Sequence, residues 1–124
     1  MNCFELRVAE DEEEEGLRQM ALPGRDPIYL HAEPALADAH IAWAEIVDDN
    51  GTPAMDVKFT EEGIRRLRDM RDHYVGKKMA ILVEGRLLLA PVIQDTLHVE
   101  GLLLSTQRLP RHEMERVIRL LMGS

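Results

Sequence analysis

Apolar and polar residues alternate with a period of two in several short segments of the chain. Residues 4–9 and 54–59 show this pattern most clearly, and such alternation is typical of a strand with one buried face. Residues 41–48 precede the second of these segments, and Asn50-Gly51 follows them. Because Asn-Gly readily adopts the positive φ angles of a two-residue turn, we expect a β-hairpin here.

Two segments have the spacing of amphipathic helices, with apolar residues three and four positions apart. Thr60 precedes two acidic residues, so its hydroxyl is expected to cap the first helix, and Gly76 is expected to end it. Pro110 suits the first turn of the second helix. The apolar positions are Ile64, Leu67, Met70 and Tyr74 within residues 60–75, and Met114, Val117, Ile118 and Leu121 within residues 110–123.

The remaining apolar runs predict further short strands at residues 28–31, 79–83, 86–90 and 102–105. The run at 79–83 is continuous, which favours a central strand covered on both faces. The predicted order is β-β-β-β-α-β-β-β-α. The simplest arrangement is a single α+β domain over residues 1–124, with one mixed or antiparallel β-sheet and the two amphipathic helices packed on it.

The distribution of charge predicts a loop between the first two strands. The chain of 124 residues has 15 Lys and Arg against 23 Asp and Glu, a formal net charge of −8, and residues 10–15 are all acidic. Self-repulsion in this run, and the prolines and glycine that follow it, predict a mobile acidic loop over residues 10–27. A net-negative chain is also a poor candidate for nucleic-acid binding, because phosphates are neutralised by clustered Lys and Arg.

The positive charge lies in the second half of the chain. Residues 64–124 hold 11 basic and 7 acidic side chains, a net charge of +4. The simpler interpretation is that these charges keep the exposed faces of the helices solvated. The alternative is a basic face that binds an anionic partner or the chain's own acidic loop, formed by Arg65, Arg66, Arg68, Arg116 and Arg119.

Residue patterns that carry catalysis are absent from the sequence. Ser105 lies in no Gly-x-Ser-x-Gly motif, and the glycines are too dispersed for a nucleotide-binding loop. No two histidines have the i, i+4 spacing of a helical metal site; they are His31, His40, His73, His98 and His112. We therefore expect no enzyme activity, no catalytic residue, and no metal or cofactor. The alternative, a metal-dependent enzyme whose ligands come from separate loops, is favoured by no spacing.

The start of the chain and its single cysteine bear on the compartment. The first residues lack the basic and apolar regions of a secretion signal, and no apolar run approaches the ~20 residues of a membrane-spanning helix. We expect a cytoplasmic chain unless a leader has been removed. Cys3 has no partner for an internal disulfide, so it is expected to be an inert thiol or the remnant of a lipid-attachment cysteine.

Three blocks of sequence, each of them weak evidence alone, together form a distinctive pattern. They are Phe59-Thr60-Glu61-Glu62-Gly63, residues 74–86, and Ala90-Pro91-Val92-Ile93-Gln94. In their order and spacing, over residues 4–118, the chain resembles the head of the large first periplasmic domain of SecD, the accessory subunit of the Sec preprotein translocase. It departs from that pattern at Val75, at Glu84, and at residues 102–107, where the family has a stretch rich in glycine and serine.

The resemblance implies an α+β module outside the cytoplasm that engages the emerging preprotein. We therefore expect a non-enzymatic module, related to protein export, that binds a polypeptide or protein partner, with Sec components among the candidates. Strand addition is the expected mode, along an edge formed by Leu87, Leu88 and Leu89 or by Leu102, Leu103 and Leu104, although these leucines also suit a core. The alternative is a structural or regulatory domain that forms a homo-oligomer through this apolar edge.

Overall fold

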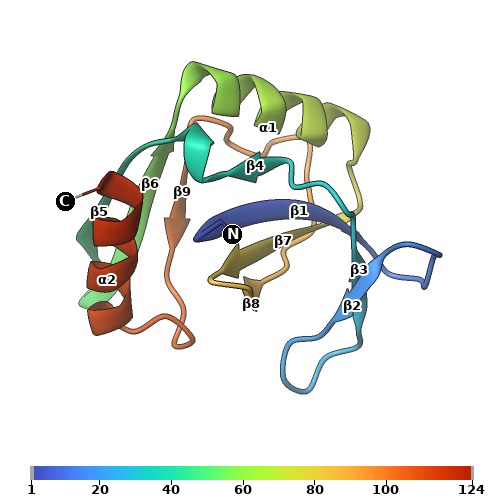
Figure 1. Ribbon diagram of the computed structural model, residues 1–124, viewed down its shortest axis with the longest axis horizontal. Helices are drawn as coiled ribbons and strands as arrows, with labels where there is room; N and C mark the ends of the chain where they lie inside the picture. Colours follow the sequence, from blue (N-terminus) through green and yellow to red (C-terminus); the bar gives the residue numbers. More distant parts are fainter. Residues whose placement is uncertain (1, 124) are drawn as a thin grey trace.

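A computed structural model describes residues 2–123, in which the strands form two antiparallel sheets (Figure 1). Sheet A has the strand order β2-β3-β1-β7-β8, with β4 also paired to β1, and sheet B has the order β5-β6-β9. The elements are β1 (Phe4–Glu10), β2 (Arg18–Met20), β3 (Ile28–Leu30), β4 (Leu36–Ala37), the 3₁₀ helix η1 (Asp38–His40), β5 (Ile41–Asp49), β6 (Thr52–Phe59), α1 (Glu61–His73), β7 (Lys78–Val83), β8 (Arg86–Leu89), β9 (Gly101–Leu104) and α2 (Arg111–Met122).

The predicted hairpin is confirmed as β5 and β6. Asn50 has φ +53° and Gly51 has φ +87°, so both turn residues are left-handed, as a type I′ turn requires. The turn places Asp49 opposite Thr52, and the pairing continues to Trp43 opposite Lys58. A bulge interrupts the register between Ile41 and Trp43.

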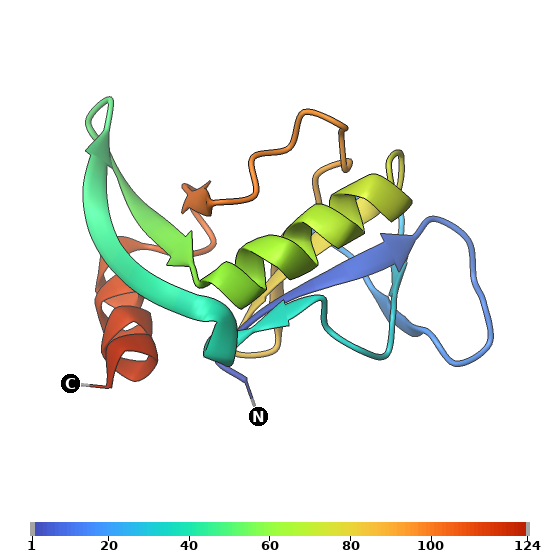
Figure 2. The ribbon, with the colours of Figure 1, turned by 90° about the horizontal axis from the view of Figure 1, so that it is seen from above.

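The two predicted helices are also confirmed, with ends within two residues of those expected. Thr60 caps α1, because its hydroxyl accepts a hydrogen bond from the backbone N–H of Gly63 at 3.0 Å. Pro110 is the N-cap of α2 and Gly123 its C-cap. In Figure 2, α1 runs diagonally over the middle of the molecule, and α2 lies to one side, against the β5–β6 hairpin. Among residues 2–123, no helix is long and apolar enough to cross a membrane.

One core joins the two sheets. Alternate residues of β1 and β6 are buried in it, together with residues of both helices, and its large, fully buried side chains include Phe4, Leu6, Met55, Leu67, Ile81 and Leu104. Sheet A buries its other face in a smaller cluster around Leu30, Leu82 and Leu87. Strand β7 is therefore covered on both sides, as its continuous apolar run predicts.

The α+β class is confirmed, but the structure differs from the expected arrangement in two respects. First, the strands form two sheets rather than one, because β9 pairs with β6 and not with β7 or β8. Second, β2 lies inside the segment 10–27, which was expected to be a loop, and pairs with β3. The residues of β2 are exposed or half-buried, so hydrophobic alternation could not reveal this strand. The mobility of the segment stays a prediction.

Candidate functional site

The six predicted leucines lie on two edge strands, one in each sheet. Leu87, Leu88 and Leu89 belong to β8, which ends sheet A, and residues 102–104 belong to β9, which ends sheet B. Both strands are edges, in different sheets, and the binding of a partner at either of them stays a prediction.

Most of these leucine side chains face the core. Leu87, Leu88 and Leu104 are at most 3% exposed, whereas Leu103 is 49% exposed. Leu102 is half-buried and packs against the main core. A partner that added a strand to β8 or β9 would therefore meet main-chain groups and Leu103 rather than a row of exposed leucines.

The edge of β8 is short and partly blocked. The strand has only four residues, and the Nε of Arg108 donates a hydrogen bond to the carbonyl oxygen of Leu87 at 3.1 Å. The side chain of Arg86 is also engaged, since its Nη2 lies 2.8 Å from Oε2 of Glu113 on α2. Short strands and charged side chains at an edge are devices that discourage strand addition.

A longer edge lies at the other end of sheet B. Strand β5 has nine residues, and within residues 2–123 its only paired neighbour is β6. The β5–β6 turn makes Asp49 and Thr52 a hydrogen-bonded pair, and such pairs alternate along an antiparallel ladder. The N–H and C=O groups of Ala44, Ile46 and Asp48 therefore point away from β6, toward the free side of β5.

Helix α2 packs on the core face of sheet B, mainly over β5, and forms a groove with this strand. The groove is shallow, with a volume of about 610 Å³, and Ile118 and Met122 of α2 contribute its apolar wall. Both residues are half-buried and pack against the main core. The lining residues are Trp43, Ala44, Glu45, Ile46, Glu115, Ile118, Arg119 and Met122.

The sequence did not single out this groove. The alanines in residues 41–47 leave the strand ambiguous with a helix when read alone, so no exposed face could be assigned to it. Trp43 lines the groove and is 53% exposed, but from the sequence alone an aromatic residue inside a strand is expected to be in the core.

The five arginines of the predicted basic face are divided between two helices. Arg65, Arg66 and Arg68 lie on α1, and the other two lie on α2 (Figure 1). Arg65 and Arg66 form ion pairs with Glu62, and Arg116 Nη2 lies 2.7 Å from Oε1 of Glu84. Binding of an anionic partner by this set stays a prediction.

The acidic run begins at an ion-paired residue and continues into solvent. Glu10 is 8% exposed; its Oε1 lies 2.7 Å from Lys77 Nζ, and its Oε2 lies 2.7 Å from His31 Nε2. Asp11 pairs with Lys78 at 2.7 Å. The hydrogen bonds from Lys77 and His31 lower the pKa of Glu10, and Glu10 raises the pKa of Lys77. The residues that pair with the run are therefore Lys77, Lys78 and His31, and not the predicted arginines.

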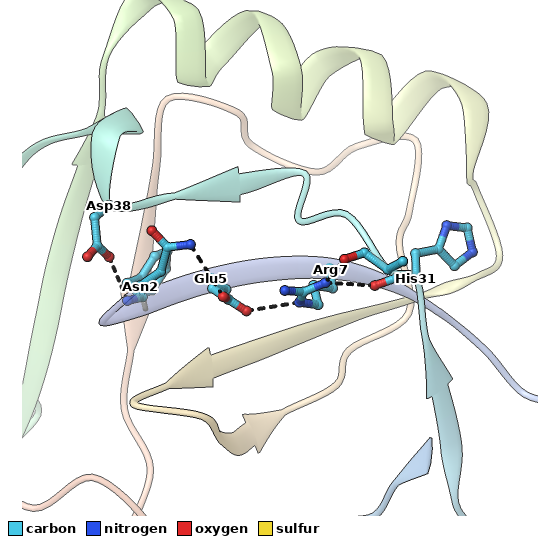
Figure 3. Close-up of polar contacts among 7 residues, drawn as sticks. Asn2, Glu5, Arg7, His31 and Asp38 are labelled. Atoms are coloured by element: carbon cyan, nitrogen blue, oxygen red, sulfur yellow. Dashed lines mark hydrogen bonds and ion pairs between the residues drawn. The ribbon is translucent and has the colours of Figure 1, made fainter. Parts of the chain in front are cut away.

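A chain of polar contacts fixes the start of β1 (Figure 3). The carboxylate of Asp38 accepts hydrogen bonds from the backbone N–H groups of Cys3 and Phe4, at 2.8 and 2.7 Å. Glu5 and Arg7 form an ion pair at 2.9 Å, and Arg7 also donates to the carbonyl oxygen of His31. Burial raises the pKa of Glu5, but Arg7 more than offsets this, so the net shift is downward.

Two further side chains near these contacts, Cys3 and His40, have shifted pKa values. Burial, with the nearby charges of Asp38 and Glu84, raises the pKa of the Cys3 thiol to about 11, so little of it is the reactive thiolate. Burial and the charge of Arg66 lower the pKa of His40, and its Nδ1 lies 3.1 Å from the backbone N of Ala37. Within residues 2–123, no three His, Cys, Asp or Glu side chains are grouped as metal ligands.

Comparison with known proteins identifies a family whose model matches most of this chain. The family model described as SecDF, P1 head subdomain, matches residues 14–107. The protein translocase subunit SecDF of Thermus thermophilus is 35% identical over 65 residues, which is 52% of this chain and 9% of that protein. Subunit SecD of Rhodobacter capsulatus is 37% identical over 54 residues, 44% of this chain and 9% of that protein. The chain thus spans about a tenth of the length of these relatives.

Solved structures give the same result for the fold. A structure of SecDF, described as a membrane component that enhances protein export, superimposes with a TM-score of 0.73 at 22% identity, over 98% of this chain and 62% of that one. SecDF in its super-membrane-facing form superimposes with a TM-score of 0.69 at 20% identity, over 98% of this chain and 18% of that one. At such identities the likeness concerns the fold alone.

Proposed function

Because this chain belongs to the SecDF P1 head subdomain family, we propose that it is a non-enzymatic module that binds polypeptides during protein export. SecDF is an accessory component of protein translocation and does not belong to a known enzyme family. The relatives of this chain are protein translocase subunits. The partner is therefore expected to be an exported polypeptide or a component of the Sec machinery.

The observation that carries this proposal is that sheet B ends in an edge strand on each side. Among the described residues, 2–123, strands β5 and β9 each pair with one neighbour, so their outer N–H and C=O groups are available to another chain. An extended polypeptide satisfies such groups with its own main chain, and these hydrogen bonds do not depend on its side chains. A module that meets many different exported sequences needs this kind of recognition.

The test is a fluorescence-anisotropy titration of the purified chain into a labelled, permanently unfolded protein. A reduced and carboxymethylated protein is a suitable probe, and the same protein in its native, disulfide-bonded form is the matched control. We expect saturable binding to the unfolded probe and at least about tenfold weaker binding to the folded control, which corresponds to ~1.4 kcal/mol. The proposal is wrong if neither the unfolded probe nor Sec components bind.

A further inference from the structure

We propose that the groove between β5 and α2 binds an extended polypeptide segment, which adds to the free edge of β5 as an antiparallel strand. This inference rests on the proposed function and assigns it a place in the fold. It differs from the edges predicted from the sequence, which are those of β8 and β9.

The first argument is the main-chain chemistry of β5. The alternation set by the β5–β6 turn leaves the N–H and C=O groups of Ala44, Ile46 and Asp48 on the free side. These are three donors and three acceptors at the spacing of a strand, and the strand that carries them has nine residues. Strands β8 and β9 have four residues each, and Arg108 blocks a carbonyl of β8.

The second argument is that the free edge of β5 is only partly protected. Natural edge strands are shielded by charged side chains, especially Lys, by Pro, by short length, by a bulge, or by a covering helix or loop. Strand β5 is long and contains neither Pro nor Lys; its charged residues are Glu45, Asp48 and Asp49, and its bulge lies at its first residues, before Trp43. Pro53, which has no N–H, lies on β6 opposite Asp48 and does not protect the free edge. A long edge of this kind is expected to have an occupant.

The third argument is the shape and chemistry of the groove. Ala44 and Ile46 point their side chains to the core face of sheet B, on which α2 packs, so every second side chain of an added strand would face Ile118 and Met122. The volume of about 610 Å³ suits a few such side chains. The lining carries charges of both signs, Glu45, Glu115 and Arg119, so the apolar side chains rather than net charge select the ligand.

The ligand is therefore an extended segment with large apolar side chains at alternate positions. In an antiparallel ladder, hydrogen-bonded partners have side chains on the same face. The residues whose side chains face α2 are then the same residues whose N–H groups bind β5. This coincidence gives a sharp test.

The probe is a fluorescein-labelled nonapeptide in which leucine alternates with threonine. N-methylation of its leucines removes the N–H groups that would bind β5, whereas N-methylation of its threonines removes N–H groups that would face solvent. We expect the leucine-methylated peptide to bind at least about tenfold more weakly than the parent, and the threonine-methylated peptide to bind within about twofold of it. Equal affinities for the two methylated peptides, or the opposite order, would overturn the proposal.

Two variants of α2 give an independent test in the same assay. Met122→Lys places a charge in the groove, and Leu120→Lys places the same charge on the same helix, where Leu120 is 57% exposed and outside the groove. We expect Met122→Lys to weaken binding of the nonapeptide about tenfold and Leu120→Lys to leave it unchanged. Circular dichroism checks that both variants are folded.

Changes in the backbone amide chemical shifts of the chain on addition of the nonapeptide locate the bound peptide directly. They also distinguish a failure of the groove as the site from a failure of the proposed function. We expect the largest changes at Ala44, Ile46 and Asp48. If unfolded polypeptide binds but the changes fall on β8 or β9, or if Met122→Lys binds as well as the parent chain, the groove is not the site and the proposed function stands. If the changes at β5 grow with protein concentration in the absence of peptide, the occupant is a second copy of the chain and this proposal is wrong. If neither the nonapeptide, nor the unfolded protein, nor Sec components bind, both proposals fail.

Discussion

Single carboxylates hold β1 at both of its ends. At the start, Asp38 accepts the backbone N–H groups of Cys3 and Phe4, which ties the strand to η1. At the end, Glu10 pairs with Lys77 in the turn after α1 and with His31 after β3. The contacts of Asp38 and Glu10 join segments that are far apart in the chain, so they depend on the tertiary structure. The contribution of each carboxylate to stability can be tested by replacing that one side chain.

The first test concerns the ion pairs of Glu10. Its pKa is lowered from the usual 4.5 by hydrogen bonds from Lys77 and His31, so the native state favours the carboxylate form. This contribution to the free energy of unfolding is present above pH 4.5 and is lost as the pH falls through the lowered pKa. We expect Glu10→Gln to lower the free energy of unfolding at pH 7 and to flatten its fall below pH 4.5, as measured by urea denaturation across pH.

The matched control changes an exposed carboxylate of the same acidic run. Glu12→Gln removes the same charge from a side chain in solvent. It is expected to leave the pH dependence of stability as it is in the parent chain. If the two variants behave alike, the contacts of Glu10 are not what stabilises the native state.

The second test concerns the thiol of Cys3. Its pKa is raised from 9.0 to about 11 by burial first and by Asp38 and Glu84 next. Because the thiolate is the reactive form, the native chain should react with iodoacetamide at pH 8 about a hundredfold more slowly than the urea-unfolded chain. Mass spectrometry of timed samples measures both rates. Equal rates would show that Cys3 is not held as the structure has it.

At the scale of elements, the block that carries the family resemblance also has a packing role. Gly63 lies in the first turn of α1, where a Cβ would come within 2.9 Å of the carbonyl oxygen of His40 and 3.1 Å of Cβ of Phe59. The same carbonyl accepts the N–H of Thr60 at 2.9 Å. The start of α1 is therefore pressed against η1 and the end of β6, and only glycine allows this approach.

Because of this packing, we expect replacement of Gly63 by alanine to destabilise the chain, although the same replacement stabilises most helices. Replacing glycine by alanine inside a helix normally stabilises it by about 0.5–1 kcal/mol. In Gly63→Ala the added methyl group would clash with backbone, so we expect a loss of about 1–3 kcal/mol in the free energy of unfolding. Arg68→Ala, at an exposed position of the same helix, should change stability by no more than about 0.5 kcal/mol. A gain in stability for Gly63→Ala would contradict this account.

Elements fixed by local chemistry were predictable from the sequence. The β5–β6 hairpin follows from Asn50-Gly51, and α1 follows from its cap at Thr60 and its apolar stripe. Strand β2 was not predictable, because Arg18 and Gln19 are exposed and the strand exists through its pairing with β3. No local pattern indicates that β9 pairs with β6, because α1, β7 and β8 lie between them in the chain.

The sequence could predict that the candidate site is an edge strand, but not which edge strand it is. The leucines of β8 and β9 indicated edge strands, and both strands are edges. The groove beside β5 depends on where α2 packs, which is a contact between segments more than 60 residues apart. Trp43 and Met122 have no relation in the sequence that would bring them together.

At the scale of the whole molecule, the two sheets, between which no strands pair within residues 2–123, share one core. Phe4 and Ile81 of sheet A and Met55 and Leu104 of sheet B are all buried in the same cluster, with α1 and α2 packed against it. If this cluster is the main source of stability, neither sheet can open without exposing the apolar face of the other. The two sheets should then unfold as one unit.

The chain has a reporter in each sheet. Its single tryptophan, Trp43, lies on β5 of sheet B, and its single cysteine, Cys3, precedes β1 of sheet A and packs against the core. We expect tryptophan fluorescence and pulsed alkylation of Cys3 to give the same urea midpoint, and Leu104→Ala to lower both midpoints together by removing about 2–5 kcal/mol. Leu103→Ala, on the exposed side of the same strand, should shift them little. Reaction of Cys3 at urea concentrations where the Trp43 signal is still native would mean that sheet A opens alone, and the shared core would then not be what couples the two halves.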